Sequence, residues 1–168
     1  MERLWAPWRL AYVAGASGDS DTCIFCDASE PGRDDLDDLI VARGQVTYVI
    51  LNLYPYNSGH LLVVPDRHVA DIATATPEEL SELMRLTRRA EMAVTEAYAP
   101  QGINIGINLG RTAGAGIVGH LHVHLVPRWN GDTNFMSVVG NVRVLPEDLG
   151  TTAKKLRPIF DRLEQEGA

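Results

Sequence analysis

The clearest hydrophobic pattern along the chain predicts a helix from Pro77 to about Tyr98. Thr76 is a suitable N-cap residue, Pro77 suits the first helical position, and Glu79 can complete a capping box. Apolar and small residues then recur at helical spacing, and we expect them to form the buried face: Leu80, Leu83, Met84, Thr87, Ala90, Val94 and Ala97.

Shorter apolar or alternating segments predict five strands: Leu39–Arg43, Val46–Asn52, His60–Pro65, residues 103–109 and His120–Val126. The first two would form a hairpin, and Pro127 should end the last strand. Within 103–109 the apolar residues alternate with Asn and Gly and should share one face. A second helix is predicted over about 146–166, where Pro158 should produce a kink or a break. This order of strands, helix, strands and helix indicates an α+β domain with an antiparallel sheet.

Length and charge limit the classes of protein that fit this pattern. The 168 residues suffice for a single domain, which we divide into an N-terminal arm (about 1–22), a core (about 23–135) and the C-terminal helical segment. The formal net charge is −7, and the excess of acidic over basic residues lies entirely between Asp19 and Asp38. We predict this segment to be a solvated loop. No basic stripe is present, which argues against a nucleic-acid partner. No apolar run approaches a membrane span or a secretory signal, so we expect no membrane partner and a cytoplasmic location.

Three of the five histidines, His120, His122 and His124, occupy alternate positions of one short segment. On a strand they would line one face, and the intervening apolar residues would fill the other. Three interpretations are open: a polar surface, a catalytic metal site, or a nucleophilic His122 supported by its neighbours. A neutral imidazole has a free lone pair, and its attack on phosphorus would split one displacement into two easier steps. We favour the third interpretation because a glycine-rich turn precedes the strand.

The glycine-rich turn over 110–119 is a candidate phosphate site. Gly114, Ala115 and Gly116 can bring backbone N–H groups close to phosphate oxygens without obstruction by side chains. Asn108, on the polar face of the preceding predicted strand, should point toward the same region. The glycine-rich turn and the three alternating histidines together therefore indicate a reaction at a phosphate ester.

The segment His120-Leu121-His122-Val123-His124-Leu125-Val126 resembles the signature of the histidine triad (HIT) family, over roughly residues 23–135. The resemblance implies an antiparallel sheet with one long helix and a C-terminal helix, a homodimer, and a nucleotide substrate. It also implies that His122 accepts a nucleotidyl group, and that His124 contacts the phosphate and assists the leaving group.

Further matches to this family are local. Asn52, eight residues before His60, is similar to the position that holds the ribose hydroxyls, and Ile50 would then line the base pocket. Residues 127–135 resemble the branch that cleaves dinucleoside polyphosphates. Many members carry Gln-Ser or Gln-Thr where this chain has Gly116-Ile117, and the surrounding residues look closer to bacterial diadenosine tetraphosphate phosphorylases. Water and phosphate both stay open as the acceptor; a nucleoside phosphoramidase, a metal-dependent phosphoesterase and a non-catalytic nucleotide-binding module are the alternatives.

The two cysteines, Cys23 and Cys26, are spaced Cys-x-x-Cys. Two histidines added to them would complete a Cys2His2 zinc site, and a redox pair or two free thiols are the alternatives. Some HIT proteins carry such a site, and the resemblance places its histidines at His68 and His120. We expect a structural zinc ion that ties the N-terminal segment to the sheet.

Overall fold

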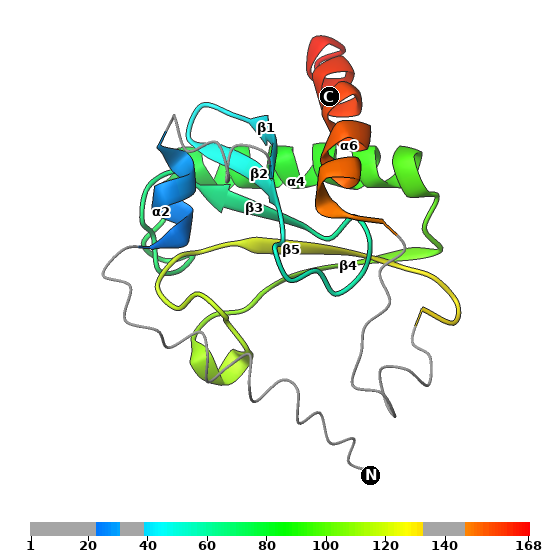
Figure 1. The fold of residues 1–168 in the computed structure, drawn as a ribbon. Coiled ribbons are helices and arrows are strands. Elements are labelled where there is room, and N and C mark those ends of the chain that lie inside the picture. The colour runs from blue at the N-terminus through cyan, green and yellow to red at the C-terminus, as the bar shows by residue number, and fades with distance from the viewer. Residues whose placement is uncertain (1–22, 31–38, 133–146) are drawn as a thin grey trace, which may run out of the picture.

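The structure is a computed structural model and describes residues 23–30, 39–132 and 147–168 (Figure 1). The predicted N-terminal arm and the end of the predicted core at residue 135 lie outside these ranges. The described elements are α2 (Ile24–Ser29), β1 (Ile40–Arg43), β2 (Thr47–Leu51), β3 (Leu61–Pro65), α4 (Pro77–Tyr98), β4 (Gly102–Ile107), a 3-10 turn (Arg111–Ala113), β5 (Val123–Arg128) and α6 (Leu149–Gln165).

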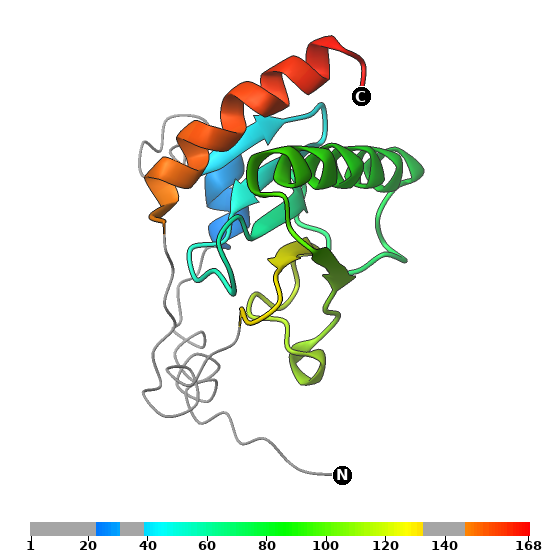
Figure 2. The same cartoon turned by 90° about the vertical axis from the view of Figure 1, so that its right-hand side faces the viewer.

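The strands form one antiparallel sheet in the order β1-β2-β3-β5-β4, which confirms the α+β prediction. Figure 2 shows α4 along one side of the sheet with α6 above it. The main core, which includes Leu83, Leu125 and Phe160, lies between the sheet and these two helices. A second apolar cluster around Phe25 of α2 lies on the opposite face. Each sheet face is therefore covered by a different part of the chain.

The long helix α4 begins as predicted. The Thr76 side chain accepts a hydrogen bond from the Glu79 N–H, and the Glu79 side chain accepts one from the Thr76 N–H, so the capping box is confirmed. The predicted buried face is wrong at Met84, whose side chain is 61% exposed. Leu83 and Leu86 pack against the covered part of the sheet, whereas Met84 lies at its edge and lines an open groove with residues of the edge strand β4.

The hairpin of β1 and β2 is confirmed, and a carboxylate of α4 holds its turn. Glu82 accepts hydrogen bonds from the N–H groups of Gln45 (2.9 Å) and Val46 (2.6 Å) and from the Thr47 hydroxyl (3.0 Å). Added to Gly44, a Cβ atom would lie 2.7 Å from the Glu82 carboxylate. A side chain at that position would push out the group that satisfies the turn.

The last strand differs from its prediction at both ends. Strand β5 begins at Val123, so His120 and His122 precede the hydrogen-bonded ladder instead of lying within it. Pro127 does not end the strand, because it lies beyond the last β3 partner of β5. The Pro127 carbonyl points away from β4 and accepts from the Asn57 side chain (3.0 Å). Since β3 does not pair with β5 at this position, the N–H that proline lacks would have no strand partner there.

One further prediction is wrong, and of the kink or break expected at Pro158 the break is absent. Part of the acidic segment predicted as a loop is the short helix α2, which packs Phe25 and Ala28 into the second apolar cluster. Helix α6 runs through Pro158 without a break. Pro158 is on an exposed side of the helix, where water can satisfy the carbonyl that the proline leaves without a partner.

Candidate active site and metal cluster

The histidines and the apolar residues of the predicted strand do lie on opposite faces of the sheet. Leu121, Val123 and Leu125 belong to the main core beneath α4 and α6. The ring of His122 lies 4.9 Å from that of His124, centroid to centroid, and 5.1 Å from the Phe25 ring of α2. The alternation therefore sorts the side chains as predicted, although the ladder starts only at Val123.

His122 is 4% exposed, and its hydrogen bond defines which nitrogen can react. Its Nδ1 lies 2.8 Å from the His120 carbonyl oxygen, which can only accept, so Nδ1 carries the proton. The other ring nitrogen, Nε2, then has a lone pair. Burial lowers the pKa of His122, and the hydrogen bond to the carbonyl opposes this effect. The ring is neutral near pH 7, as a nucleophile must be.

His124 is half-buried and contacts a fourth histidine that the sequence analysis did not assign to the site. His60 is 1% exposed, and its Nε2 lies 3.0 Å from Nδ1 of His124. Burial and then the neighbouring His122 ring lower the pKa of His124 to about 4. Among the described residues, Nε2 of His124 has no hydrogen-bond partner. The one sequence signal that pointed to His60 was its position eight residues after Asn52 in the segment that resembles the family.

The two residues expected to bind the nucleoside lie on the same face as the histidines. Ile50 pairs across the strands with Leu62, and Leu62 pairs with His124, so the three form one row. Asn52 is buried with both amide atoms in contact with neighbours: Oδ1 accepts from the Tyr54 N–H (2.9 Å), and Nδ2 lies 3.3 Å from Nδ1 of His60. Asn52 thus also positions His60.

The glycine-rich turn has a defined internal structure. The N–H of Gly114 donates to the Arg111 carbonyl (3.0 Å), and that of Ala115 donates to the Gly110 carbonyl (3.3 Å). Gly114 has a φ of 94°, which favours glycine. Two of the three N–H groups expected to hold phosphate are therefore used within the turn, whereas the Gly116 N–H has no backbone partner among the described residues. Asn108 follows β4 by one residue and is half-buried.

The four residues expected to bind metal do come together. Their ligand atoms all lie within 4.8 Å of one another: Cys23, Cys26, His68 and His120. Sγ of Cys23 lies 3.3 Å from Nδ1 of His120, and Sγ of Cys26 lies 3.3 Å from Nδ1 of His68. His120 donates from Nε2 to the Pro65 carbonyl (2.9 Å), which turns the Nδ1 lone pair toward the sulfurs.

This cluster fits a zinc ion. In a tetrahedral site, Zn–S and Zn–N bonds of ordinary length put sulfur and nitrogen ligands about 3.5 Å apart, and the observed S···N separations of 3.3 and 3.6 Å agree with that spacing. Burial, followed by the charge of Cys23, raises the pKa of the Cys26 thiol to about 11. Two thiolates so close together need a cation, and a bound metal would supply the charge.

Comparison with known proteins assigns the family. The HIT domain profile matches residues 33–131, more than half of the chain. This chain is a member of the HIT family. It is 42% identical over 161 residues to "AP-4-A phosphorylase" of Mycobacterium tuberculosis, an alignment that covers 93% of this chain and 83% of that one. Over 90 residues (54% of this chain and 49% of that one) it is 36% identical to "Bis(5'-nucleosyl)-tetraphosphatase [asymmetrical]" of Schizosaccharomyces pombe.

A solved HIT structure supports the fold. A histidine triad family protein from Mycobacterium smegmatis, described as Zn-bound, superposes with a TM-score of 0.68 at 27% identity. The match covers 88% of this chain and 99% of that one. Within the described residues no helix has the length and apolarity to span a membrane.

Proposed function

We propose that this HIT protein is a cytoplasmic enzyme that cleaves dinucleoside polyphosphates, diadenosine tetraphosphate first among them, through a nucleotidyl-His122 intermediate. The observation that carries the proposal is the hydrogen bond from His122 Nδ1 to the His120 carbonyl (2.8 Å), which leaves the Nε2 lone pair on a buried neutral ring. The similarity over 93% of the chain to a protein named for its action on AP-4-A supports this substrate class.

In the first step, Nε2 of His122 forms a bond to the α-phosphorus and the bond from phosphorus to the bridging oxygen breaks. The departing nucleotide keeps the electron pair. The ring becomes a cation whose Nδ1–H still donates to the His120 carbonyl. In the second step, an oxygen of phosphate or water attacks the same phosphorus, the bond from phosphorus to Nε2 breaks, and its electron pair returns to the ring; attacking water releases a proton to solvent. His124, the adjacent ring, contacts the phosphate and stabilises the charge on the leaving oxygen.

The substrate-binding residues surround these rings. Ile50 lines the base pocket, and the Asn52 side chain holds the ribose. Asn108 and the Gly116 N–H contact the phosphates. In that arrangement, Gly114 and Ala115 shape the turn through their own hydrogen bonds.

We further propose that Cys23, Cys26, His68 and His120 hold one structural zinc ion. The four ligands close the coordination shell, so no position is left for substrate. The ion supplies the charge that keeps both cysteines deprotonated. These ligands connect α2 and the segment after β3 to the backbone that orients His122.

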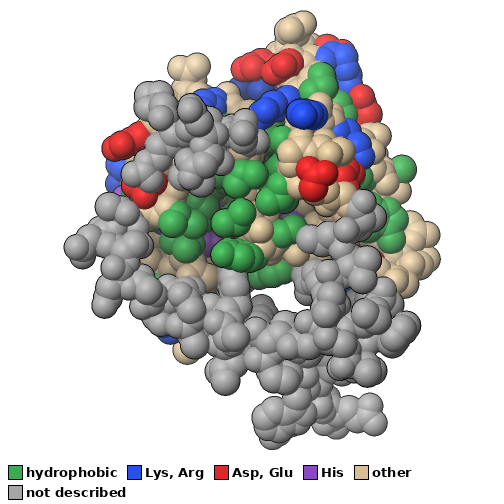
Figure 3. Space-filling model, in the orientation of Figure 1, with side chains coloured by type: hydrophobic (Ala, Val, Ile, Leu, Met, Phe, Trp, Pro, Cys, Tyr) green, Lys and Arg blue, Asp and Glu red, His purple; other side chains and the backbone are tan. Residues whose placement is uncertain are grey.

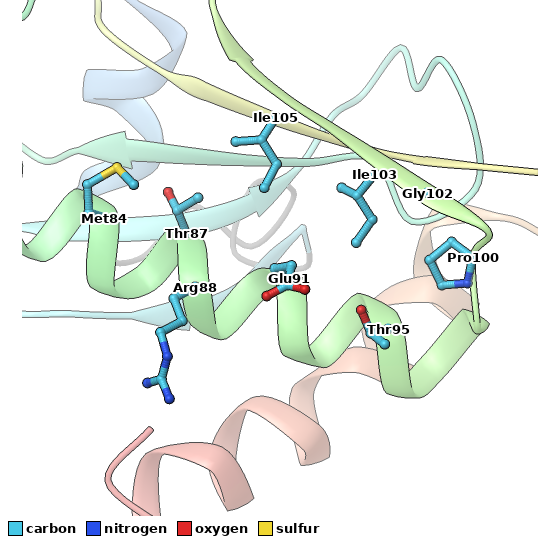
Figure 4. Close-up of a pocket in the computed structure, with 9 residues that line it drawn as sticks. All are labelled: Met84, Thr87, Arg88, Glu91, Thr95, Pro100, Gly102, Ile103 and Ile105. Atoms are coloured by element: carbon cyan, nitrogen blue, oxygen red, sulfur yellow. The ribbon is translucent and has the colours of Figure 1, made fainter.

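A homodimer is the proposed assembly. Strand β4 is the last strand on its side of the described sheet, and Ile105 on it is 48% exposed. Figure 4 shows the adjoining groove between α4 and β4, in which Met84 and Ile103 lie near Ile105. Arg88 and Glu91 also line this groove, so a second copy related by a two-fold axis can place opposite charges together. Pairing of two β4 strands would satisfy both exposed edges.

The decisive experiment incubates the protein with diadenosine tetraphosphate, with and without inorganic phosphate. ADP plus ATP identifies phosphorolysis, and AMP plus ATP identifies hydrolysis. Mass spectrometry after a rapid acid-free quench should detect a nucleotidyl adduct on the peptide that contains His122. The matched variant His122→Ala should bind the substrate in calorimetry and release no product. Turnover by this variant would refute the nucleophile, and the absence of any product with the native chain would refute the substrate class.

A further inference from the structure

Residues 52–60 connect β2 to β3, and we name them the nucleoside loop because they begin with Asn52. Figure 3 shows the face of the sheet on which the histidines lie, with parts of their side chains visible among apolar side chains. Burial does little to fix the start of the loop on this face, because Leu53 is 54% exposed and Tyr54 is 63% exposed. Polar contacts must therefore hold the loop in place.

The strongest of these contacts lead to one carboxylate, that of Asp132. The side-chain amide of Asn57 donates from Nδ2 to the Pro127 carbonyl (3.0 Å) and to Oδ2 of Asp132 (2.9 Å). Both N–H groups of this amide are thus used on the chain at the end of β5. Figures 1 and 2 both show the loop beside this end of the strand. The nucleoside loop is therefore attached to a segment about 70 residues away in the sequence.

Asp132 is itself held in a fixed position. Arg128 donates to it in a bidentate manner, from Nε to Oδ2 (2.5 Å) and from Nη2 to Oδ1 (3.0 Å). The Trp129 N–H also donates to Oδ2 (3.2 Å), and the Asp132 side chain is only 9% exposed. Nη1 of Arg128 donates to Oδ1 of Asn104 on β4 (2.9 Å). The carboxylate that receives the loop is thus fixed relative to two strands of the sheet.

The end of the loop packs against α4. Gly59 has a φ of 74°, and a Cβ atom added to it would lie 2.9 Å from the Tyr98 ring at the end of that helix. At the start of the loop, the Tyr54 N–H donates to Oδ1 of Asn52 (2.9 Å). The conformation of the loop backbone therefore sets the orientation of the Asn52 amide.

We infer that Asp132 is a positioning residue for nucleoside binding: its carboxylate holds the nucleoside loop in the conformation in which the Asn52 amide meets the ribose. The inference rests on the proposed function and adds to it a residue that lies outside both the loop and the histidine segment. A binding group that is already held in place loses less freedom when its ligand arrives. The contact between Asn57 and Asp132 acts on the nucleoside and not on the reacting phosphorus. It should therefore change affinity more than kcat.

Calorimetry with AMP measures this contribution without turnover. Asp132→Ala should weaken AMP binding about ten-fold, because the loop loses its anchor and must be ordered by the ligand. Asn57→Ala breaks the same contact from the loop side and should give a similar loss. The double variant should stay within about two-fold of either single variant. Arg162→Ala is the control, because it removes exposed ion pairs of α6 with Glu96 and Glu166 and should bind AMP like the native chain.

A double-mutant cycle separates positioning from general damage to the fold. If Asp132 acts through Asn52, its loss should cost little once the Asn52 amide is absent. In the Asn52→Ala chain, Asp132→Ala should therefore change the dissociation constant of AMP by less than about two-fold. Equal ten-fold losses with and without Asn52 would assign a general structural role to Asp132 and overturn the inference. Asp132→Asn keeps one oxygen as an acceptor for Asn57 and should lose less affinity than Asp132→Ala.

Steady-state kinetics with diadenosine tetraphosphate gives the second readout. In Asp132→Ala, KM should rise about ten-fold while kcat stays within about three-fold of the native value. A loss confined to kcat, or AMP binding that is the same in the native chain, Asp132→Ala and Asn57→Ala, would overturn the inference and leave the proposed function intact. If the native chain binds AMP but cleaves no dinucleotide, the proposed function fails, and the AMP affinities of the same variants still decide whether Asp132 positions the loop.

Discussion

The depressed pKa of His124 predicts a specific loss of stability in mild acid. Burial and the adjacent His122 ring lower this pKa from 6.5 to about 4 in the folded chain. Between these two values the unfolded chain binds more protons than the folded chain, so the free energy of unfolding falls as the pH falls. The contribution is fully present above pH 6.5 and is lost progressively toward pH 4.

The magnitude follows from the two pKa values. Linkage predicts a loss of about 2 kcal/mol between pH 7.5 and pH 5, and about 3 kcal/mol by pH 4. Other groups titrate over the same range, so the test is a difference between two proteins. His124→Asn places an amide group where Nδ1 was, which keeps a hydrogen-bonding partner for Nε2 of His60 and removes the titrating ring.

Urea denaturation at a series of pH values measures this difference. The native chain should lose about 2 kcal/mol more than His124→Asn between pH 7.5 and pH 5. Parallel stability curves for the two proteins would show that the fold does not penalise a charged His124. The neutral state on which its assigned role depends would then have no support from burial.

Three other changes test separate parts of the structure. Glu82→Ala should lower the free energy of unfolding by about 2–4 kcal/mol in urea denaturation, because two backbone N–H groups and the Thr47 hydroxyl lose their acceptor. Phe25→Leu should reduce kcat roughly ten-fold with little change in KM in steady-state assays, because the centroid of the Phe25 ring lies 5.1 Å from that of His122. An unchanged kcat would show that α2 does not position His122. Cys26→Ser should remove zinc from the purified protein by elemental analysis and lower its unfolding temperature, whereas full stability without metal would argue against a structural ion.

Local signals in the sequence predicted the elements that local physics controls. The capping box at Thr76 and Glu79 begins α4 where it was expected, and the alternation of histidines with apolar residues placed each set on its own face. The Cys-x-x-Cys pair needed the family resemblance to find its two histidines, since nothing within the chain marks His68 as their neighbour.

Long-range packing decided what the sequence could not. Met84 has the same spacing as the buried residues of α4, and only the position of β4 makes it part of an exposed groove. The N–H groups of Gly114 and Ala115, which were expected to bind phosphate, donate instead to carbonyl groups within the turn. His60 joins the site through hydrogen bonds with residues that no periodic pattern connects to it.

Two neighbouring imidazoles can have opposite chemical roles only if something outside each ring assigns its single proton. The sequence repeats the same residue at 122 and 124, so the side chains themselves do not distinguish nucleophile from donor. The partner of Nδ1 differs between them: it is the His120 carbonyl oxygen at His122 (2.8 Å) and Nε2 of His60 at His124 (3.0 Å). The surroundings of each ring, and not the residue type, therefore distinguish the two positions.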